Sequence, residues 1–502
     1  MNNVENRTLF FGDNLDILKE KIPSESVDLI YLDPPFNSNR AYNILHKNNG
    51  EDSPSQIEAF NDTWNWNTIG VQENFNRLVE NKENIKISDL MIGLEKVIGK
   101  NGTLAYLSMM TTRLIELKRV LKSTGSIYLH CDPSASHYLK IVMDIIFGEE
   151  NFVNEIIWSY KSGGISQCSF SRKHDTILFY SKTNKYKFNL QKESRDISEL
   201  KKKYKQEDEK GHYGQMKKDG KKYYFEDGVT MRDVWEIPIL NQLSKERLGY
   251  PTQKPEALLE RIIKASSNEG DIVLDPFCGC GTTVAVSERL NRKWIGIDIT
   301  PLAINVIRKR MVDHYPNIKI NLDGLPKDLD GAKMLAEQCG INGRFDFQYW
   351  ILSLINARPA PNKSKNQKKG KDYGIDGIIR YNETDINFKN EYKDIIISVK
   401  SGKNPKSPEI RDLRGVIENR NASGGIYVTL YPPTNDMLKE ATLSGTYKYQ
   451  NISIPKLQIC LVEDILNGIM PLIPQSQEIN LCKKAEKVEI KEDKSKQKSL
   501  FE

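Results

Sequence analysis

The sequence has no long apolar run. A helix that crosses a membrane needs roughly 20 apolar residues, and no stretch of the 502-residue chain approaches that. The first residues, MNNVENRTLF, also lack the basic segment followed by an apolar stretch that marks a secretory signal. We therefore expect a cytoplasmic protein that does not contact a membrane.

Cysteine is scarce. The chain has 7 cysteines, an odd number, and none of them forms a CxxC pair. This argues against a disulfide framework and against a structural zinc site. Cys278 and Cys280 stand closest together, and we interpret them as small residues that fill a turn.

A strong excess of one charge is also missing. The formal net charge is +6, which by itself says little about nucleic-acid binding. At about 150 residues per domain, the length favours roughly three structural units.

Strand-like and helix-like segments alternate over the first 320 residues. The apolar run SVDLIYL at 26–32 ends abruptly in DPPFN, as a buried parallel strand that opens into a loop does. Downstream, TTRLIELKRVLK has helical spacing and SIYLH is strand-like, and the same succession recurs in SASHYLKIVMDIIFG and NEIIWSY. Such alternation is typical of an α/β sheet.

Asp33, Pro34, Pro35 and Phe36 follow the first of these strands. In open α/β sheets, ligands bind beyond the carboxyl ends of strands. An exocyclic amino nitrogen of a base is a poor nucleophile, and acceptors from Asp33 and a rigid diproline carbonyl would let it attack a methyl donor. Phe36 would stack on a base that has left the duplex. DPP alone also fits a simple strand-ending turn.

A glycine turn at VLDPFCGCGTT supplies a second site. Its spacing is GxGTT, neither the GxGxxG of dinucleotide folds nor the GxxxxGKT of phosphate loops. Asp298, at the end of the next strand, is placed to accept hydrogen bonds from ribose hydroxyls, although a helix N-cap role also fits.

Together, DPPF and DPFCGCGTT resemble DNA amino-methyltransferases of the beta class, in which the catalytic motif comes first. PTQKP at 251–255 and LHCDPSASHYLKIVMDIIFGEENF resemble further family elements, and the resemblance covers residues 8–320. It implies base contacts from Asp33 to Phe36 and no metal in this core. It also implies a set of residues around S-adenosylmethionine: Thr252, Lys254, Asp275, Pro276, Phe277, Gly279, Gly281, Thr282 and Asp298.

The resemblance also bears on the substrate. An aspartate first in the tetrad goes mostly with adenine in this family, so Asp33 favours N6-adenine over N4-cytosine. Methylation of RNA and methylation of a protein glutamine are alternative enzyme activities. A binding module that retains the cofactor pocket without catalysis is the alternative that is not an enzyme. The family's target-recognition region corresponds to 159–249, whose basic and aromatic residues suit DNA but also fit a solvated loop. The chain departs from the family pattern at Leu45 to Thr103, where it has a long insert and several relatives have a shorter link.

A further unit follows. GIDGIIRY and IIISVKSGK resemble the Mrr-like branch of PD-(D/E)XK restriction nucleases. The resemblance implies a metal-binding Asp376 and a strand Lys400, with Asp346 or Gln348 as an extra ligand. Ser398 occupies the place of an acid or amide and would coordinate a divalent ion poorly. Three possibilities stay open: an active nuclease, a DNA-binding module, or a fold kept for packing and dimer contacts.

The last residues form a charged tail. Gln497, Leu500 and Phe501 resemble the peptide that docks on bacterial sliding clamps, and an unstructured solubilising end is the alternative.

The sequence thus predicts a Rossmann-like α/β methyltransferase core, an inserted recognition region and a C-terminal α/β nuclease-like domain. The expected function is site-specific methylation of double-stranded DNA by base flipping, in a restriction-modification or related system. A homodimer and a separate restriction subunit are possible partners. The expected boundaries are 1–158 and 250–322 for the core halves, 159–249 for recognition, 340–475 for the nuclease-like domain and 483–502 for the tail.

Overall fold

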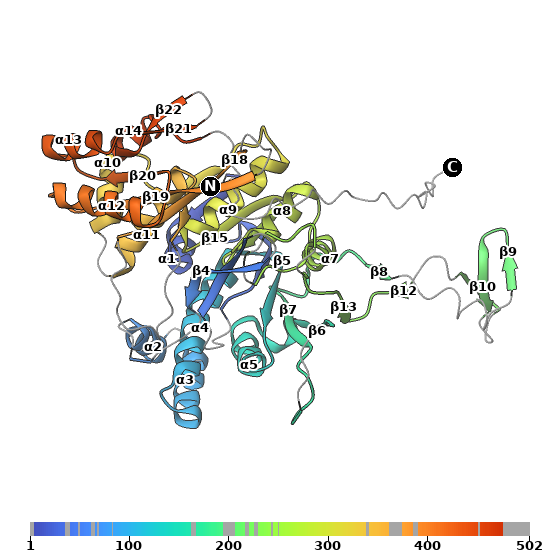
Figure 1. Cartoon of the computed structure of the whole chain (residues 1–502). Coiled ribbons are helices and arrows are strands. Elements are labelled where there is room, and N and C mark those ends of the chain that lie inside the picture. The colour runs from blue at the N-terminus through green and yellow to red at the C-terminus, as the bar shows by residue number, and fades with distance from the viewer. Residues whose placement is uncertain are drawn as a thin grey trace.

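The structure is a computed structural model, shown in Figure 1. It describes residues 5–35, 41–48, 51–61, 66–67, 70–82, 84–161, 167–193, 206–215, 220–224, 229–241, 244–248, 250, 252–337, 341–360, 374–384, 390–449 and 452–474.

Within these ranges, nine strands form one large sheet. In order across the sheet they are β13 (Val234–Glu236), β6 (Phe152–Ser159), β7 (His174–Ser181), β5 (Leu121–Cys131), β2 (Val27–Leu32), β14 (Ile272–Asp275), β15 (Lys293–Asp298), β1 (Thr8–Phe11) and β16 (Asn321–Asp323). From β5 to β16 all neighbours are parallel, whereas β7 runs antiparallel to both β5 and β6. This mostly parallel sheet with one reversed strand confirms the predicted α/β core. The short strands β13 and β16 form its two edges.

Helices cover both faces of this sheet. They are α1 (Asn14–Lys21), α2 (Val71–Val79), α3 (Ile85–Ile98), α4 (Gly102–Val120), α5 (Ser136–Phe147), α7 (Glu256–Ser266), α8 (Thr282–Arg289) and α9 (Pro301–His314). Alternate residues of β2 divide between the faces, as the period of a strand requires. Ile30 and Leu32 join the core beneath α1, α4 and α5, whereas Leu29 and Tyr31 join the core beneath α7.

The insert after DPPF holds both strands and helices. A hairpin of β3 (Ala41–Asn48) and β4 (Glu51–Asn61) comes first, and α2 and α3 then pack beside α4. Phe75, Leu78 and Met91 of these two helices are buried in the core under α4, so part of the insert belongs to the core itself.

The expected recognition region contains short strands. They are β8 (Lys192–Glu193), β9 (Gln206–Asp208), β10 (Gly211–Gln215), β11 (Lys222–Tyr224) and β12 (Val229–Thr230). Strands β8 and β12 pair with each other, and β9, β10 and β11 form a small antiparallel sheet that lies beyond them in Figure 1.

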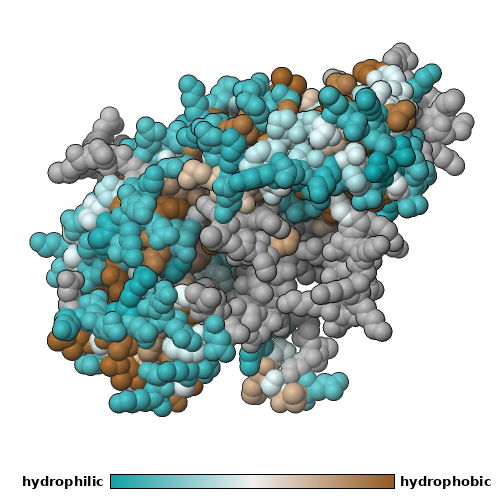
Figure 2. Space-filling model, turned by 90° about the vertical axis from the view of Figure 1, so that its left-hand side faces the viewer, coloured by the Kyte–Doolittle hydropathy of each residue, from teal (hydrophilic) through white to brown (hydrophobic). Residues whose placement is uncertain are grey.

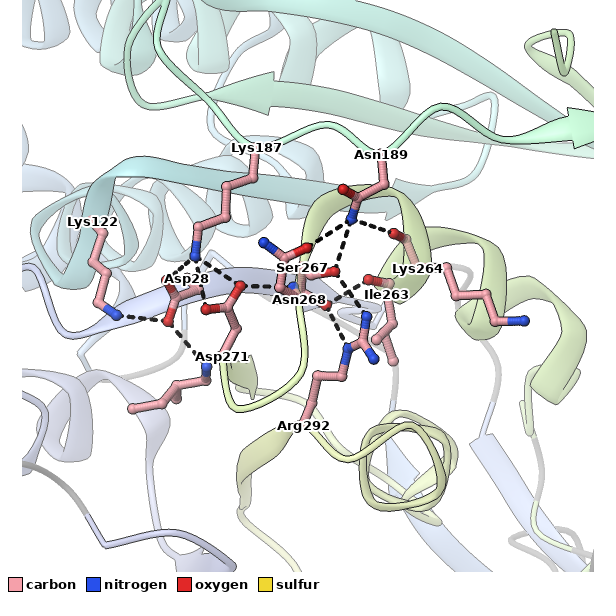
Figure 3. A network of polar contacts seen from close by, with 11 residues as sticks. Asp28, Lys122, Lys187, Asn189, Ile263, Lys264, Ser267, Asn268, Asp271 and Arg292 are labelled. Carbon is pink, nitrogen blue, oxygen red and sulfur yellow. Dashed lines mark hydrogen bonds and ion pairs between the residues drawn. The ribbon is translucent and has the colours of Figure 1, made fainter. Parts of the chain in front are cut away.

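A polar network fixes the segment that leads from β7 into this region (Figure 3). Lys187 Nζ contacts both Asp28 Oδ1, at 2.9 Å, and Asp271 Oδ2, at 2.7 Å. Asn189 donates its side-chain amide to the carbonyls of Lys264 and Ser267, at 2.9 and 3.0 Å. Because Asp28 and Asp271 stand near the beginnings of β2 and β14, the network lies at the edge of the sheet opposite to Asp33.

The C-terminal part has its own five-stranded sheet. Its order is β17 (Arg358–Pro359), β18 (Gly377–Thr384), β19 (Asn390–Lys400), β20 (Gly424–Thr429) and β23 (Leu457–Leu461). The remaining elements are α10 (Leu329–Glu337), α11 (Ile341–Leu354), α12 (Ser407–Asn419), α13 (Asn435–Leu443), β21 (Thr446–Tyr449), β22 (Ile452–Pro455) and α14 (Val462–Leu466). Phe11 and Leu325 pack against its core, so the two sheets share an apolar contact.

No helix within the described ranges is long and apolar enough to cross a membrane. The coloured residues on the face shown in Figure 2 are mostly hydrophilic, with hydrophobic residues in small groups.

Candidate active site

The strands that carry the expected catalytic and cofactor motifs end at one edge of the large sheet. Because β2, β14, β15 and β1 are parallel, their carboxyl ends lie side by side. Strand pairing sets Phe11 against Asp298, Asp275 against Gly296, and Leu274 against Ile30. Asp33 follows directly on β2, so DPPF and the glycine turn are brought together although they are far apart in the sequence.

Asp33 offers one free acceptor atom. Its Oδ2 accepts a hydrogen bond from the Lys254 ammonium, and the side chain is 17% exposed. Its Oδ1 is buried and has no hydrogen-bond partner among the described residues. A buried carboxylate oxygen without a donor is unfavourable in a finished fold, and it is expected where a ligand supplies the donor. Pro34 and Pro35 follow Asp33, and Phe36 lies outside the described residues.

The backbone of the glycine turn requires residues without a side chain. Gly279 and Gly281 have φ angles of +49° and +74°, which L side chains rarely adopt. A Cβ on Gly281 would lie 2.7 Å from Ile307 Cγ1. Gly281 is also the N-cap of α8, which begins with Thr282. The turn therefore presents backbone N–H groups at the amino end of a helix.

Asp298 holds this turn through hydrogen bonds. Asp298 Oδ2 accepts the N–H of Gly279 at 2.9 Å, and its Oδ1 accepts both the N–H and the hydroxyl of Thr300, at 2.9 and 2.8 Å. Burial raises the pKa of Asp298, although these hydrogen bonds oppose the shift. Thr300, not Asp298, caps α9. Oδ1 thus already accepts two hydrogen bonds, whereas Oδ2 accepts one among these contacts, so a ribose hydroxyl would bind at Oδ2.

Lys254 joins the two halves of the site. Its carbonyl accepts the hydroxyl of Thr282 at 3.3 Å, at the start of α8, while its ammonium lies on Asp33. The side chain of Gln253 holds this segment by bonds to the N–H of Leu248 and the carbonyl of Glu246, at 2.8 and 2.7 Å. Thr252 is exposed and has a φ of +63°. Among the expected cofactor residues, Lys254 is thus the one that contacts Asp33.

Several supporting residues were missed by the sequence reasoning. Asn14 donates its side-chain amide to the carbonyl of Pro276 at 2.7 Å and accepts from Arg113 Nε at 2.5 Å. His130 is fully buried and contacts Asp175. The signal in the sequence for Asn14 was its place at the start of a helix after a strand. His130 belongs to LHCDP, which supported the family resemblance but was not interpreted as part of a site.

The C-terminal candidates come from the second sheet and from α11: Asp376 directly precedes β18, Ser398 and Lys400 lie on β19, and Asp346 and Gln348 lie on α11. Asp376 Oδ2 accepts the N–H of Val399 at 2.6 Å and the hydroxyl of Ser398 at 3.4 Å. Burial raises the pKa of Asp376, an effect that Lys400 opposes electrostatically. Gln348 donates to the carbonyl of Asp376 at 3.3 Å, and burial raises the pKa of Asp346 to about 6. Across the described part of the chain, no three His, Cys, Asp or Glu side chains form a group that could hold a metal ion.

Comparison with known proteins decides the family. The model of the family described as DNA methylase matches residues 27–309, more than half of the chain. The chain belongs to the DNA methylase family. A second family model, described as restriction endonuclease, matches residues 343–450 of this DNA methylase, within the second sheet and its helices.

Named relatives agree with the family. The chain is similar to the Type II methyltransferase M.HpaI of Haemophilus parainfluenzae, at 34% identity over 263 residues, which cover 50% of this chain and 74% of that protein. It is 30% identical to the DNA adenine methyltransferase YhdJ of Escherichia coli K12 over 319 residues, 62% of this chain and 85% of that protein. A solved PvuII DNA methyltransferase, cytosine-N4-specific, aligns at 16% identity over 64% of this chain and 96% of that one, with a TM-score of 0.38.

The protein is thus a DNA methyltransferase that uses S-adenosylmethionine, with an Mrr-like endonuclease domain at its C-terminal side. The backbone N–H groups at the start of α8 and the acid at Asp298 fit this cofactor.

Proposed function

We propose that this DNA methylase transfers a methyl group to N6 of adenine in double-stranded DNA, within a restriction-modification or related system of the cytoplasm. The observation that carries the proposal is the buried Oδ1 of Asp33, which has no donor among the described residues. An exocyclic amino group would supply that donor.

The chemistry requires acceptors on the amino hydrogens. The lone pair of an exocyclic nitrogen is delocalised into the ring, and hydrogen bonds to Asp33 Oδ1 and to a carbonyl of the Pro34–Pro35 segment would localise it for attack. When bound, S-adenosylmethionine supplies the electrophilic methyl on its sulfonium. The Lys254 ammonium keeps Oδ2 occupied, so Oδ1 is the oxygen that faces the base. Fixed acceptors of this kind need no reorganisation during the reaction.

Adenine is favoured over cytosine by the aspartate at the first position of the tetrad. In addition, one relative with 85% of its length covered is named a DNA adenine methyltransferase. N4-cytosine is the alternative base. In either case the base must leave the duplex, since Asp33 lies at the edge of a sheet and is only 17% exposed.

The recognition region offers groups suited to DNA. Lys222 lies over the ring of Tyr213, 4.0 Å from its centroid, and pairs with Asp208 at 2.7 Å. Lysine and tyrosine on one small sheet suit phosphate contacts and stacking. We propose that the β9–β11 sheet contributes to target recognition.

Methyl transfer from tritium-labelled S-adenosylmethionine to unmethylated bacterial DNA, followed by nucleoside analysis, tests this function. We expect label in N6-methyladenine, and loss of the label in Asp33→Ala with cofactor binding retained. Label in N4-methylcytosine would overturn the choice of base. Label on RNA or protein but not on DNA would overturn the proposal.

A second candidate function belongs to the C-terminal domain. The restriction endonuclease match and the placement of Asp376 beside Val399 on the strand of Lys400 support action on DNA there. Incubation of plasmid DNA with Mg²⁺ or Mn²⁺ separates the alternatives. Cleavage that Asp376→Ala and Lys400→Ala both abolish would indicate a nuclease. DNA binding without cleavage, weakened by Lys400→Ala, would indicate a binding module.

A further inference from the structure

The segment that follows β1 contacts the glycine turn from outside it. Asn14, the first residue of α1, is 7% exposed, and its side-chain amide donates to the carbonyl of Pro276 at 2.7 Å. In the sheet, β15 lies between β1 and β14. The hydrogen bond therefore joins segments that follow two strands which do not pair with each other. The proposed methyl-transfer chemistry assigns Asn14 no role.

The carbonyl of Pro276 needs a donor from elsewhere in the fold. Pro276 is buried and directly follows Asp275, the last residue of β14. A proline has no N–H with which to continue the ladder of a sheet. A buried backbone carbonyl without a donor is unfavourable. Because the strand has ended, the side chain of Asn14 supplies this donor.

The contact lies at the beginning of a series of bonds that shape the turn. Asn14 holds the carbonyl of Pro276, and the next N–H, that of Phe277, donates to the carboxylate that ends β14, at 3.0 Å. Further along, the N–H of Gly279 donates to Asp298 Oδ2 at 2.9 Å. The backbone that leads to Gly279 is thus fixed at both ends, by Asn14 and by Asp298.

Arg113 of α4 fixes the direction of the Asn14 amide. Its Nε donates to Asn14 Oδ1 at 2.5 Å, and its Nη2 donates to both oxygens of Asp13, at 2.7 and 3.0 Å. The arginine side chain is 12% exposed. An arginine only donates hydrogen bonds and a carbonyl only accepts them. The amide oxygen of Asn14 must therefore face Arg113, and its nitrogen must face Pro276.

We propose that Asn14 is a positioning residue for S-adenosylmethionine, which holds the Pro276 carbonyl and thereby keeps the glycine turn in the shape that receives the cofactor. Arg113 acts through Asn14. A turn that is already shaped in the free protein loses less conformational freedom on binding, which strengthens the complex. The inference concerns the cofactor and not the base, so it holds whether adenine or cytosine is methylated.

Asn14→Asp separates the two contacts of this side chain. The new carboxylate has the same shape, and Arg113 would still donate to one oxygen, but the other oxygen would face the Pro276 carbonyl without a proton. We expect the Kd for S-adenosylmethionine, measured by calorimetry on the full-length protein without DNA, to rise at least about tenfold. Asn14→Ala, which leaves the carbonyl without a donor, should weaken binding in the same direction.

The rate of methyl transfer is the second measurement. At saturating S-adenosylmethionine, Asn14→Asp should transfer methyl groups within about threefold of the wild-type rate. The reason is that the turn holds the cofactor equally in the ground state and in the transition state, so its distortion raises the KM and spares kcat.

Asn74→Asp is the matched control. Asn74 of α2 also donates its side-chain amide to a backbone carbonyl of another segment, that of Ser108 in α4, at 2.9 Å. The substitution places a carboxylate against a carbonyl in the same way, but at a contact between two helices outside the glycine turn. We expect this variant to bind the cofactor within about twofold of the wild-type Kd.

A double-mutant cycle tests the role of Arg113. Arg113→Lys keeps a cation for Asp13, but an ammonium lacks the rigid fork that bonds to Asp13 and Asn14 together. We expect the Kd for S-adenosylmethionine to rise about threefold in the wild-type background, and not to rise further in the Asn14→Ala background.

All Kd values are to be measured well below the melting temperature of each variant, so that a loss of stability alone does not change them. The inference is overturned if Asn14→Asp and Asn14→Ala both bind the cofactor as tightly as Asn74→Asp. It is also overturned if Asn14→Asp binds normally and loses methyl transfer at saturating cofactor. If Arg113→Lys weakens binding equally with and without Asn14, Arg113 does not act through Asn14.

Discussion

Thr283 donates its hydroxyl to Asp275 Oδ2 at 2.6 Å, from the first turn of α8 back to the end of β14. The N–H of Phe277 completes the pair by a 3.0 Å bond to Oδ1. Asp275 thereby connects the end of β14 to both the start of the glycine turn and the first turn of α8. Burial nevertheless raises its pKa to about 7, because these two bonds do not offset the loss of water and the neighbouring carboxylates Asp33 and Asp298 add to the shift.

The first prediction concerns pH and Asp275. The folded state holds a proton on this group that the unfolded chain releases at its usual acidic pKa, so this contribution to stability is present at low pH. It is lost as pH rises toward the folded pKa of about 7. Asp275→Asn removes the titration. We expect the free energy of unfolding of the variant, relative to wild type, to increase from pH 5 to pH 8 in urea titrations. A difference that is constant over this range would contradict the raised pKa.

Asp28 should show the opposite trend. Burial opposes its ionisation, but Lys122, Lys187 and the N–H of Ile272 outweigh it and lower the pKa of Asp28 (Figure 3). Its contribution is therefore present at neutral pH and lost as pH falls through the acidic range. We expect Asp28→Asn to destabilise the protein at pH 7 and to differ less from wild type as the pH falls below about 4. If Asp28→Asn were as much less stable than wild type in acid as at pH 7, the lowered pKa of Asp28 would be refuted.

Gly281→Ala should damage the cofactor turn. The positive φ alone costs about 1–3 kcal/mol for a residue with a side chain, and the new Cβ would lie 2.7 Å from Ile307 Cγ1. We expect a lower melting temperature and weaker binding of S-adenosylmethionine by calorimetry.

Gly93→Ala is its control, because Gly93 lies within α3 and a Cβ there meets nothing within 4 Å. This change should be neutral or stabilise the helix by up to about 1 kcal/mol. If the two variants had the same melting temperature and the same affinity for S-adenosylmethionine, the conclusion that the turn requires glycine at position 281 would be wrong.

We expect removal of the buried charge of Glu256 to destabilise the protein. Its Oε1 accepts from Arg310 Nη2 at 2.6 Å, and both side chains are at most 7% exposed. Glu256→Gln leaves the arginine without a counter-ion and should lower the free energy of unfolding by about 3–5 kcal/mol. Asp330→Asn, at a pair with Lys333 where the acid is 89% exposed, should change it by less than about 1 kcal/mol. Comparable losses in the two variants would show that burial is not the cause.

The sequence by itself determined the family, the order of the two motifs and most elements of the core. Segments such as VDLIYL and DIVLD are short apolar runs bounded by turn residues, so local pattern sufficed to predict β2 and β14. The strand at Ser398 and the acid at Asp376 were likewise readable from GIDG and SVK. Because each of these motifs is a run of consecutive residues, it can be recognised without knowing which residues are neighbours in the fold.

Only the tertiary structure decided which side chains meet. Lys254 stands 221 positions from Asp33, and His130 stands 45 positions from Asp175, so no local pattern could pair them. Asp33 follows the carboxyl end of β2 and Lys254 reaches it from the segment before α7, whereas His130 on β5 meets Asp175 at the start of the antiparallel strand β7. The free oxygen of Asp33 is likewise a property of packing, since it depends on which donors the fold brings near and which it keeps away.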